Sequence, residues 1–370
     1  MNFDFSSEQI ELRNQTRRFL EDKCPSTAVR AVLEGMAQYD RALWAGLAEM
    51  GLLGINIPES YGGAGLGYLE ICVVAEEFGR VLAPVPFSSS VYLATEALLA
   101  VGSNAQKVRW LPLLASGRAI GTFAVTERSG PLIPGSIRAE VHNGVLAGAK
   151  LPVPDGEIAD FAIVLAQSPE GPSLFLVELA QPGVTRSAVE TIDPTRGHVR
   201  LDFTGAAAEP LGASGTGWTL TEELFDKAAI LTAFEQVGGA DKALEMARDY
   251  ALERTAFGRP IGSFQAIKHM LADMYVSATL ARSNAYYGAW ALSSGAVELP
   301  QAAATVRVSA TQAYQHCARN AIQVHGGMGF TWAFDCHLHY RRSNLLALSL
   351  GGQSQWEDKL IERLRRRAAA

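Results

Sequence analysis

A change of sequence pattern near residues 121 and 221 constrains the fold of this chain more than any other feature. Before residue 115 and after residue 221, apolar residues recur with helical spacing, whereas short β-branched or apolar runs fill the middle. The long patterns at residues 224–254 and 264–294, and a third that ends at Val324, suit an antiparallel four-helix bundle. We therefore predict an α+β multidomain fold: an N-terminal helical domain (residues 1–115), a central antiparallel β domain, as a sheet or small barrel (residues 116–215), and a C-terminal four-helix bundle (residues 216–370).

Gly, Pro and polar residues set the expected bounds of the elements. Ser6 or Ser7 is expected to cap a first helix, with Glu8 in its opening turn. Other helices are predicted at residues 39–50, 68–80, 91–101, 107–115 and 355–366. Strands are predicted at residues 121–126, 145–149, 161–166, 173–177, 184–187 and 199–203. Residues 58–67 contain four glycines, so this segment is predicted to be a loop.

Composition excludes several classes of function. The 370 residues are 48% apolar and 19% charged, which is typical of a globular protein. The net charge of −6 gives no reason to expect a nucleic-acid partner. No run of about eighteen apolar residues occurs, so no membrane-spanning helix is expected. Phe3-Asp4-Phe5 precedes a charged amphipathic helix, which predicts that no signal peptide is present and that the protein is cytoplasmic.

The cysteines do not form a metal-binding pattern. Cys24, Cys72, Cys317 and Cys336 lie far apart, and none belongs to a Cys-x-x-Cys pair. Cys336-His337-Leu338-His339 brings a thiol near two imidazoles, but no second ligand pair accompanies it. We expect buried or unreactive thiols and no metal site.

Two stretches carry residues that suit a dinucleotide. Arg254-Thr255-Ala256-Phe257-Gly258 places a fixed cation, an aromatic ring and a glycine at the end of a long helical pattern. Gln323-Val324-His325-Gly326-Gly327 places an amide and two glycines after another one. An arginine pairs with phosphate oxygens through two parallel hydrogen bonds, and glycines let a backbone approach a ligand closely.

Together these stretches resemble the motifs of the acyl-CoA dehydrogenase family of flavoproteins. Three further motifs follow the order of that family along the chain: Ile57-Pro58-Glu59-Ser60-Tyr61-Gly62-Gly63, Phe123-Ala124-Val125-Thr126-Glu127 and Gly262-Ser263-Phe264-Gln265. The resemblance runs nearly end to end, and it implies a helical, β and helical domain in that order. It also implies an FAD cofactor, an acyl-CoA thioester substrate, a tetrameric assembly and an electron-transferring flavoprotein as electron acceptor.

The resemblance assigns cofactor contacts to particular residues. Arg254 and Phe257 would reach across a subunit interface onto a neighbour's FAD, with Arg254 at the pyrophosphate. Gln265 would contact a flavin-nucleotide group in the same way, and Gln323, Gly326 and Gly327 would line the adenosine or pyrophosphate. The strand that meets the flavin ring would supply Phe123, Val125 and Thr126.

Departures from the family pattern affect the chain's own flavin pocket. The family's next flavin-facing strand is usually aromatic, aliphatic, hydroxyl and Asn, but this chain has Pro152-Val153-Pro154-Asp155. Pro154 has neither a hydroxyl nor an N–H to offer a flavin. After Glu127 the chain reads Arg128-Ser129-Gly130-Pro131-Leu132, where the family usually continues with Pro and Gly-Ser-Asp.

The catalytic base of the family is also missing. Family chemistry removes a proton α to a thioester carbonyl, which requires a carboxylate, and Gly351 stands at the position of that Glu. Some relatives place the base on the long helix, where this chain has Ala228, followed by Ala229 in place of a coenzyme-binding Arg, although Asp226 is retained. We therefore predict no catalytic residue in this chain.

This pattern favours one reading over two others. The leading hypothesis is the base-less subunit of a heterotetrameric acyl-CoA dehydrogenase of the steroid side-chain type, which binds FAD at an interface with a homologous, catalytically complete chain. A second is a self-sufficient homotetrameric dehydrogenase with a relocated base such as Glu235. A third is a flavin-free scaffold or acyl-CoA-binding protein.

Overall fold

The structure, a computed structural model, describes residues 5–369 in two compact units. Phe3 and Asp4, which entered the argument about a signal peptide, lie outside the described residues. Unit 1 comprises Met1–Val29, Tyr68–Ala83 and Ala229–Ala370, and unit 2 comprises Arg30–Gly67 and Pro84–Ala228. The boundaries of the three predicted domains, near residues 115 and 215, stay a prediction.

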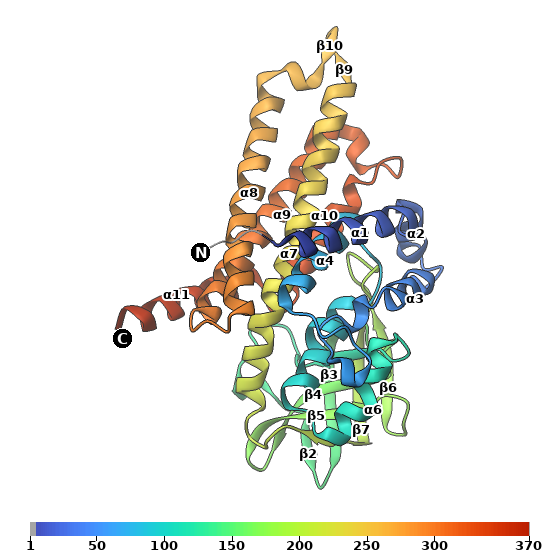
Figure 1. Cartoon of the computed structure of the whole chain (residues 1–370), viewed down its shortest axis with the longest axis vertical. Helices are drawn as coiled ribbons and strands as arrows, with labels where there is room; N and C mark the ends of the chain where they lie inside the picture. Colours follow the sequence, from blue (N-terminus) through green and yellow to red (C-terminus); the bar gives the residue numbers. More distant parts are fainter. Residues whose placement is uncertain (1–4, 370) are drawn as a thin grey trace. The chain divides into compact units, whose positions relative to one another are not determined.

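Unit 1 is helical. Its elements are α1 (Ser7–Lys23), α4 (Tyr68–Val81), most of α7 (Gly217–Glu253), β9 (Thr255–Ala256), β10 (Arg259–Pro260), the 3-10 turn η5 (Ile261–Ser263), α8 (Gln265–Ser293), α9 (Leu299–His325), the 3-10 turn η6 (Gly326–Phe330), α10 (Cys336–Leu348) and α11 (Gln353–Ala369). Figure 1 shows α7, α8 and α9 running side by side, with the β9–β10 hairpin joining the ends of α7 and α8. The predicted C-terminal helical bundle is therefore confirmed.

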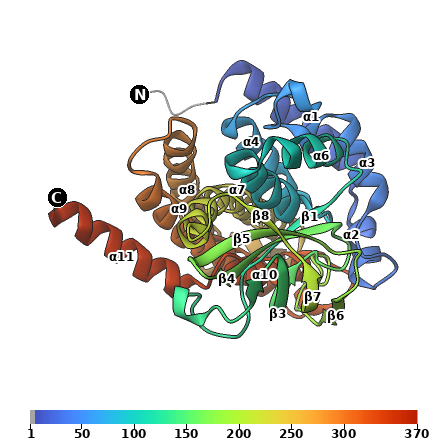
Figure 2. The same ribbon diagram turned by 90° about the horizontal axis from the view of Figure 1, so that it is seen from below.

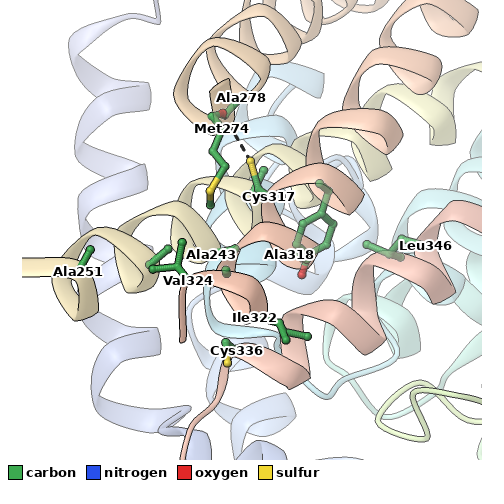
Figure 3. Close-up of a cluster of buried hydrophobic side chains, with 14 residues drawn as sticks. Ala243, Ala251, Met274, Ala278, Cys317, Ala318, Ile322, Val324, Cys336 and Leu346 are labelled. Carbon is green, nitrogen blue, oxygen red and sulfur yellow. Dashed lines mark hydrogen bonds between the residues drawn. The ribbon is translucent and has the colours of Figure 1, made fainter. Parts of the chain in front are cut away.

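Small residues allow these helices to approach closely. Ala243 and Ala251 of α7, Ala278 of α8 and Ala318 of α9 are buried together in one cluster (Figure 3). The contact between α4 and α7 is closer still, because a Cβ added at Gly79 would lie 1.9 Å from the backbone oxygen of Glu235. Alanine and glycine at these positions therefore fix the spacing of the helices in unit 1.

Ion pairs compensate the buried acidic residues of α4. The Arg17 guanidinium donates two hydrogen bonds of 2.8 Å to the Glu77 carboxylate, and Arg282 donates one of 2.8 Å to Glu76. Arg80 of α4 binds both carboxylate oxygens of Glu245 on α7. A buried carboxylate without such a partner would be strongly destabilising, so these pairs hold α1, α7 and α8 against α4.

Unit 2 contains a mostly antiparallel sheet. Its strands are β1 (Gly121–Ala124), β2 (Glu140–His142), β3 (Val145–Pro154), β4 (Phe161–Ser168), β5 (Gly171–Glu178), β6 (Val184–Val189), β7 (His198–Ala207) and β8 (Glu209–Leu211). The strand order is β6-β7-β3-β2-β4-β5-β8, with β1 paired to β4. The sheet is seen from below in Figure 2. The predicted antiparallel sheet is confirmed in the main, although β1 runs parallel to β4 and β2 pairs with β4 in parallel at one position.

Helices and turns surround this sheet within unit 2. They are the second half of α2 (Ser26–Leu33), α3 (Arg41–Glu49), the 3-10 turns η1 (Leu52–Gly54), η2 (Glu59–Tyr61) and η4 (Pro134–Ser136), the π-helix η3 (Ser88–Thr95), α5 (Glu96–Val101) and α6 (Asn104–Ala115). The start of α7 also belongs to unit 2.

Three helical segments differ from the sequence prediction, and the first of them, α2, was not expected at all. The helix predicted at residues 91–101 begins as the π-helix at Ser88, where the Ser89 hydroxyl donates to the Pro86 carbonyl oxygen at 3.1 Å. Serine hydroxyls compete in this way with the regular helical ladder. The sequence analysis did not anticipate α10, because its buried face includes the polar residues His337, His339 and Arg342, which weaken the apolar pattern.

Within the described part of the chain, each helix is either too short or too polar to traverse a bilayer.

Candidate functional site

The hairpin after α7 presents two of the predicted cofactor residues to solvent. Phe257 and Gly258 form its turn with φ angles of 53° and 80°, and the Phe257 side chain is 95% exposed. Arg254 is exposed as well, while its backbone N–H donates to Tyr250 O and its carbonyl oxygen accepts from Ile261 N. A phenylalanine with positive φ is uncommon and costs on the order of 1 kcal/mol. The two-residue turn of the hairpin requires these positive φ angles, but the packing of the chain does not account for the exposure of the Phe257 ring.

The same hairpin is tied to the start of α8. The ring of Phe264 lies 6.2 Å from that of Phe257, edge to face, and the Arg259 guanidinium lies 4.2 Å from the Phe264 ring centroid. Gln265, exposed, follows Phe264 as the first residue of α8. Arg254, Phe257 and Gln265 therefore lie on one short, internally braced segment.

The end of α9 presents the remaining predicted residues. Gln323, Gly326 and Gly327 are all exposed, and Gly326 ends the helix with a φ of 61°. A Cβ added at Gly327 would meet no heavy atom within 4 Å, whereas one at Gly329 would lie 2.7 Å from the Ile322 backbone oxygen. The fold of the chain thus explains Gly326 and Gly329. No contact within the chain and no positive φ requires a glycine at position 327.

The residues predicted to face the flavin ring have a different environment, in unit 2. Phe123 and Val125 are buried, at 3% and 6% exposure, and the Thr126 hydroxyl donates to Pro152 O at 3.2 Å. The backbone oxygen of Val125 accepts a hydrogen bond of 3.1 Å from the Lys150 ammonium. These groups already have partners within the chain, and their assignment to a flavin stays a prediction.

An ion pair between Lys150 and Glu127 holds the segment that follows this strand. The Glu127 carboxylate accepts from Lys150 Nζ at 2.7 Å, from Arg138 N at 2.7 Å and from Ala139 N at 3.0 Å. Lys150 is completely buried, and burial lowers the pKa of its ammonium to about 8 despite the Glu127 carboxylate. The hydrogen bonds of the Glu127 carboxylate therefore fix both ends of the irregular segment between residues 127 and 138.

The strand that departs from the family pattern is bound internally. The Thr122 hydroxyl donates to Pro154 O at 2.5 Å, and the Ser89 hydroxyl donates to the Asp155 carboxylate at 2.5 Å. Asp155 has a φ of 53° and is buried. The groups of this strand end thus bind unit 2 itself, and Pro154 offers no donor of its own.

The loop that contains Gly351 leaves no room for a side chain at this position. Leu350 and Gly351 both have positive φ, 61° and 103°, and a Cβ at Gly351 would lie 2.6 Å from Gln355 Oε1. That amide oxygen already accepts from Gly352 N at 3.2 Å, and the Trp356 indole donates to Leu350 O at 3.1 Å. A Glu at this position would be strained, because the backbone there disfavours any side chain.

A buried arginine anchors the start of this loop. Arg307 of α9 is 1% exposed and donates to the backbone oxygens of Leu346 and Ser349, the latter at 2.6 Å. Its other terminal nitrogen donates to Gln236 Oε1 at 2.7 Å, which joins the loop to α7. Arg307 was not predicted as a site residue, although a lone arginine in the alanine-rich stretch between residues 302 and 313 was a usable signal.

The two acidic residues of α7 considered above are buried. Glu235, the candidate for a relocated base, is 0% exposed and lies in unit 1, where α4 packs against α7. Asp226 is 5% exposed and lies in unit 2, next to Lys227, whose ammonium binds Glu96. Complete burial at a close helix contact suits a structural role for Glu235.

Neither cysteines nor histidines gather into a metal site. No group of three or more His, Cys, Asp or Glu side chains among residues 5–369 is arranged to hold a metal ion. The Cys336 thiol donates to Gly329 O at 3.3 Å, and Tyr314 and His339 share a hydrogen bond of 3.0 Å. Burial lowers the pKa of His339 to about 3, so this imidazole is neutral at physiological pH.

Comparison with known proteins gives matches along most of the chain. Residues 6–118 match the family described as acyl-CoA dehydrogenase, N-terminal domain, and residues 215–363 match acyl-CoA dehydrogenase, C-terminal domain. The chain is 33% identical over 338 residues to acyl-CoA dehydrogenase IpdE2 of Mycobacterium tuberculosis, covering 91% of each sequence.

Solved structures agree with these matches. A chain of the Tcur3481-Tcur3483 steroid ACAD has a TM-score of 0.88 at 31% identity, covering 98% of this chain and 99% of the other. A chain of the ChsE4-ChsE5 complex from Mycobacterium tuberculosis has a TM-score of 0.89 at 29% identity, covering 100% and 99%. The similarity thus extends over whole chains of similar length.

Proposed function

The chain belongs to the acyl-CoA dehydrogenase family, whose members are FAD-dependent oxidoreductases, and we propose that it is the base-less subunit of a heteromeric enzyme. In this proposal a homologous partner carries the catalytic carboxylate and the acyl-CoA thioester. The present chain completes the binding site for the partner's FAD. One observation carries the proposal: the backbone at Gly351 disfavours any side chain, while Arg254 and Gln323, which are predicted to bind a cofactor, are exposed.

The exposed residues fit an FAD dinucleotide. Arg254 offers two parallel N–H donors to paired phosphate oxygens, and Gln265 and Gln323 each offer both a donor and an acceptor. The open space at Gly327 would let a nucleotide approach the backbone. FAD supplies the hydride acceptor of the reaction when it is bound, and these side chains bind and orient it.

The strand that would face a flavin in this chain supports the proposal that the chain binds its partner's FAD and not one of its own. Thr126 and the carbonyl oxygen of Pro154 are bound to groups of unit 2, and Pro154 replaces the family's hydroxyl residue. The active-site loop has no carboxylate at Gly351 to remove the α proton. Residues that would serve a neighbour are thus open, whereas those that would serve the chain's own site are replaced or occupied.

The similar proteins support the kind of partner and substrate. Two of the similar structures each carry the names of two different chains, and one is described as a steroid ACAD. We therefore propose a homologous acyl-CoA dehydrogenase chain as partner, in a heterotetramer, and the thioester of a steroid side chain as substrate. An electron-transferring flavoprotein is the proposed electron acceptor.

The test is purification of the complex from its native source, with FAD measured per chain. We expect a homologous, Glu-bearing chain to co-purify and the isolated chain to show no acyl-CoA-dependent flavin reduction. Arg254→Lys keeps the charge but loses the paired geometry, so FAD affinity should fall by about tenfold or more. Arg248→Lys, an exposed arginine on the same helix that pairs with Asp249, is the matched control. Full acyl-CoA dehydrogenase activity of the isolated chain would overturn the proposal.

A further inference from the structure

We infer that His325 is a positioning residue, which holds the Gly326–Gly327 turn of α9 in register with Arg254 of α7. This inference rests on the proposed function, because it concerns how the two exposed stretches reach one dinucleotide together. The two stretches are about seventy residues apart in sequence, and a contact between them is needed to set their relative position. His325 and Tyr250 supply that contact within unit 1.

The contact is a stack of aromatic rings. The His325 imidazole lies 4.2 Å from the Tyr250 ring at an interplanar angle of 23°, and Phe334 meets both rings edge-on at 5.4 Å and 5.5 Å. The three rings come from α9, α7 and the segment before α10. Such ring pairs prefer defined offsets, so the stack resists sliding of one helix end along the other.

A hydrogen bond fixes the orientation of the imidazole. His325 Nδ1 and the Ala321 carbonyl oxygen are 2.7 Å apart, and because a carbonyl only accepts, Nδ1 carries the proton. The ring is 5% exposed, and burial lowers its pKa, which keeps it neutral at physiological pH. The neutral ring therefore faces Tyr250 in one orientation.

Each of the two stacked residues, His325 and Tyr250, is connected through the backbone to a residue proposed to bind the cofactor. His325 immediately precedes Gly326, whose N–H closes the helix on Gln323 O and whose φ of 61° turns the chain. On the other side, the Tyr250 carbonyl oxygen accepts from the N–H of Arg254 one helical turn later. A shift of the imidazole would thus move the glycine turn relative to the guanidinium, and two-pronged phosphate binding tolerates little displacement.

Two variants separate the ring from its hydrogen bond. His325→Phe keeps the stack but loses the donor to Ala321 O, whereas His325→Asn keeps a donor near the place of Nδ1 but loses the ring. In the co-purified complex, stripped of flavin and titrated with FAD, His325→Asn should weaken FAD binding by about three- to tenfold, and His325→Phe by less than about threefold. Titrations are made well below the unfolding temperature of each variant.

A double-mutant cycle with Arg254→Lys distinguishes positioning from general stability. If His325 acts through Arg254, the effect of His325→Asn should largely vanish in the Arg254→Lys background. Equal effects in both backgrounds, or His325→Asn binding FAD as tightly as the wild type, would overturn the inference.

Hydrogen exchange tests the same inference without FAD. In the isolated chain, the amides of Gly326 and Gly327 should exchange faster in His325→Asn than in His325→Phe. Equal exchange in the two variants would refute positioning by the ring. If the wild-type complex does not bind FAD, the proposed function is refuted. The inference about His325 is then tested by the hydrogen-exchange result alone.

Discussion

Restoring the family's base by Gly351→Glu is expected to destabilise the chain without making it a dehydrogenase. Gly351 has a φ of 103°, and a non-glycine residue in such a region costs about 1–3 kcal/mol. Its Cβ would lie 2.6 Å from Gln355 Oε1, so that amide must move and give up its hydrogen bond to Gly352 N, worth about 1 kcal/mol. The lower entropy of the unfolded variant offsets about 0.4–1 kcal/mol of this loss. A net destabilisation of about 1–3.5 kcal/mol follows.

The assay compares urea-unfolding midpoints of three variants under identical conditions. Gly351→Ala carries the same backbone strain without a carboxylate, so it should match Gly351→Glu. Gly352→Ala is the control, because Gly352 has no positive φ and its added Cβ would meet nothing within 4 Å. Its midpoint should stay close to that of the wild type.

Activity provides the second measurement on Gly351→Glu. The isolated variant should still fail to reduce flavin with acyl-CoA, because Pro154 offers neither a hydroxyl nor an N–H where the family pattern has a hydroxyl residue. The reasoning is refuted if Gly351→Glu is as stable as Gly352→Ala, or if it turns over acyl-CoA alone.

Three further outcomes are expected. Gly327→Ala should leave the urea-unfolding midpoint unchanged but weaken FAD binding in the complex. Gly329→Ala should lower the midpoint, because its added Cβ would lie 2.7 Å from Ile322 O. Equal midpoints of the two variants would contradict this difference. The pKa of Lys150 is about 8 in the folded chain against 10.5 in a free lysine, so the unfolded chain binds more protons between these values and wild-type stability should rise across that pH range. Lys150→Met should lack this rise when urea midpoints are compared at pH 7.5, 8.5 and 9.5, and parallel curves would refute the assignment. Arg307→Lys cannot reach both Ser349 O and Gln236 Oε1, so hydrogen exchange at Gly351 and Gly352 should quicken, and unchanged exchange would contradict an anchoring role.

The long helices could be predicted from sequence because their patterns persist over many turns. The expected helices at residues 224–254 and 264–294 correspond to α7 (Gly217–Glu253) and α8 (Gln265–Ser293). Shorter elements were less predictable: β3 extends to Pro154, five residues beyond its expected end, and β2 was not anticipated. A three-residue strand contains too few alternations to produce a pattern, so only pairing with β3 defines it.

Some residues of the candidate site could likewise be predicted from sequence, and others could not. Arg254, Phe257 and Gln323 could be named because each lies in a contiguous motif that resembles the family. His325, Tyr250 and Arg307 could not, because their partners are distant in sequence and side-chain contacts between helices leave no local pattern. Gly351 was predicted from the resemblance to stand in place of a base, whereas its positive φ could not be predicted.

The sequence alone determined the order of helical and β segments and the presence of a glycine at position 351, where the family resemblance predicts a carboxylate, because hydrophobic period and side-chain identity are properties of the chain itself. The tertiary structure decided which groups remain open to a ligand and which are already bound. Exposure of Arg254 and Gly327, burial of Phe123 and the hydrogen bond from Thr126 to Pro152 O depend on how distant segments pack. Solvent access and hydrogen-bond partners arise from that packing, so the contrast between the exposed residues proposed to bind a cofactor and the hydrogen-bonded strand of unit 2 is a property of the folded chain.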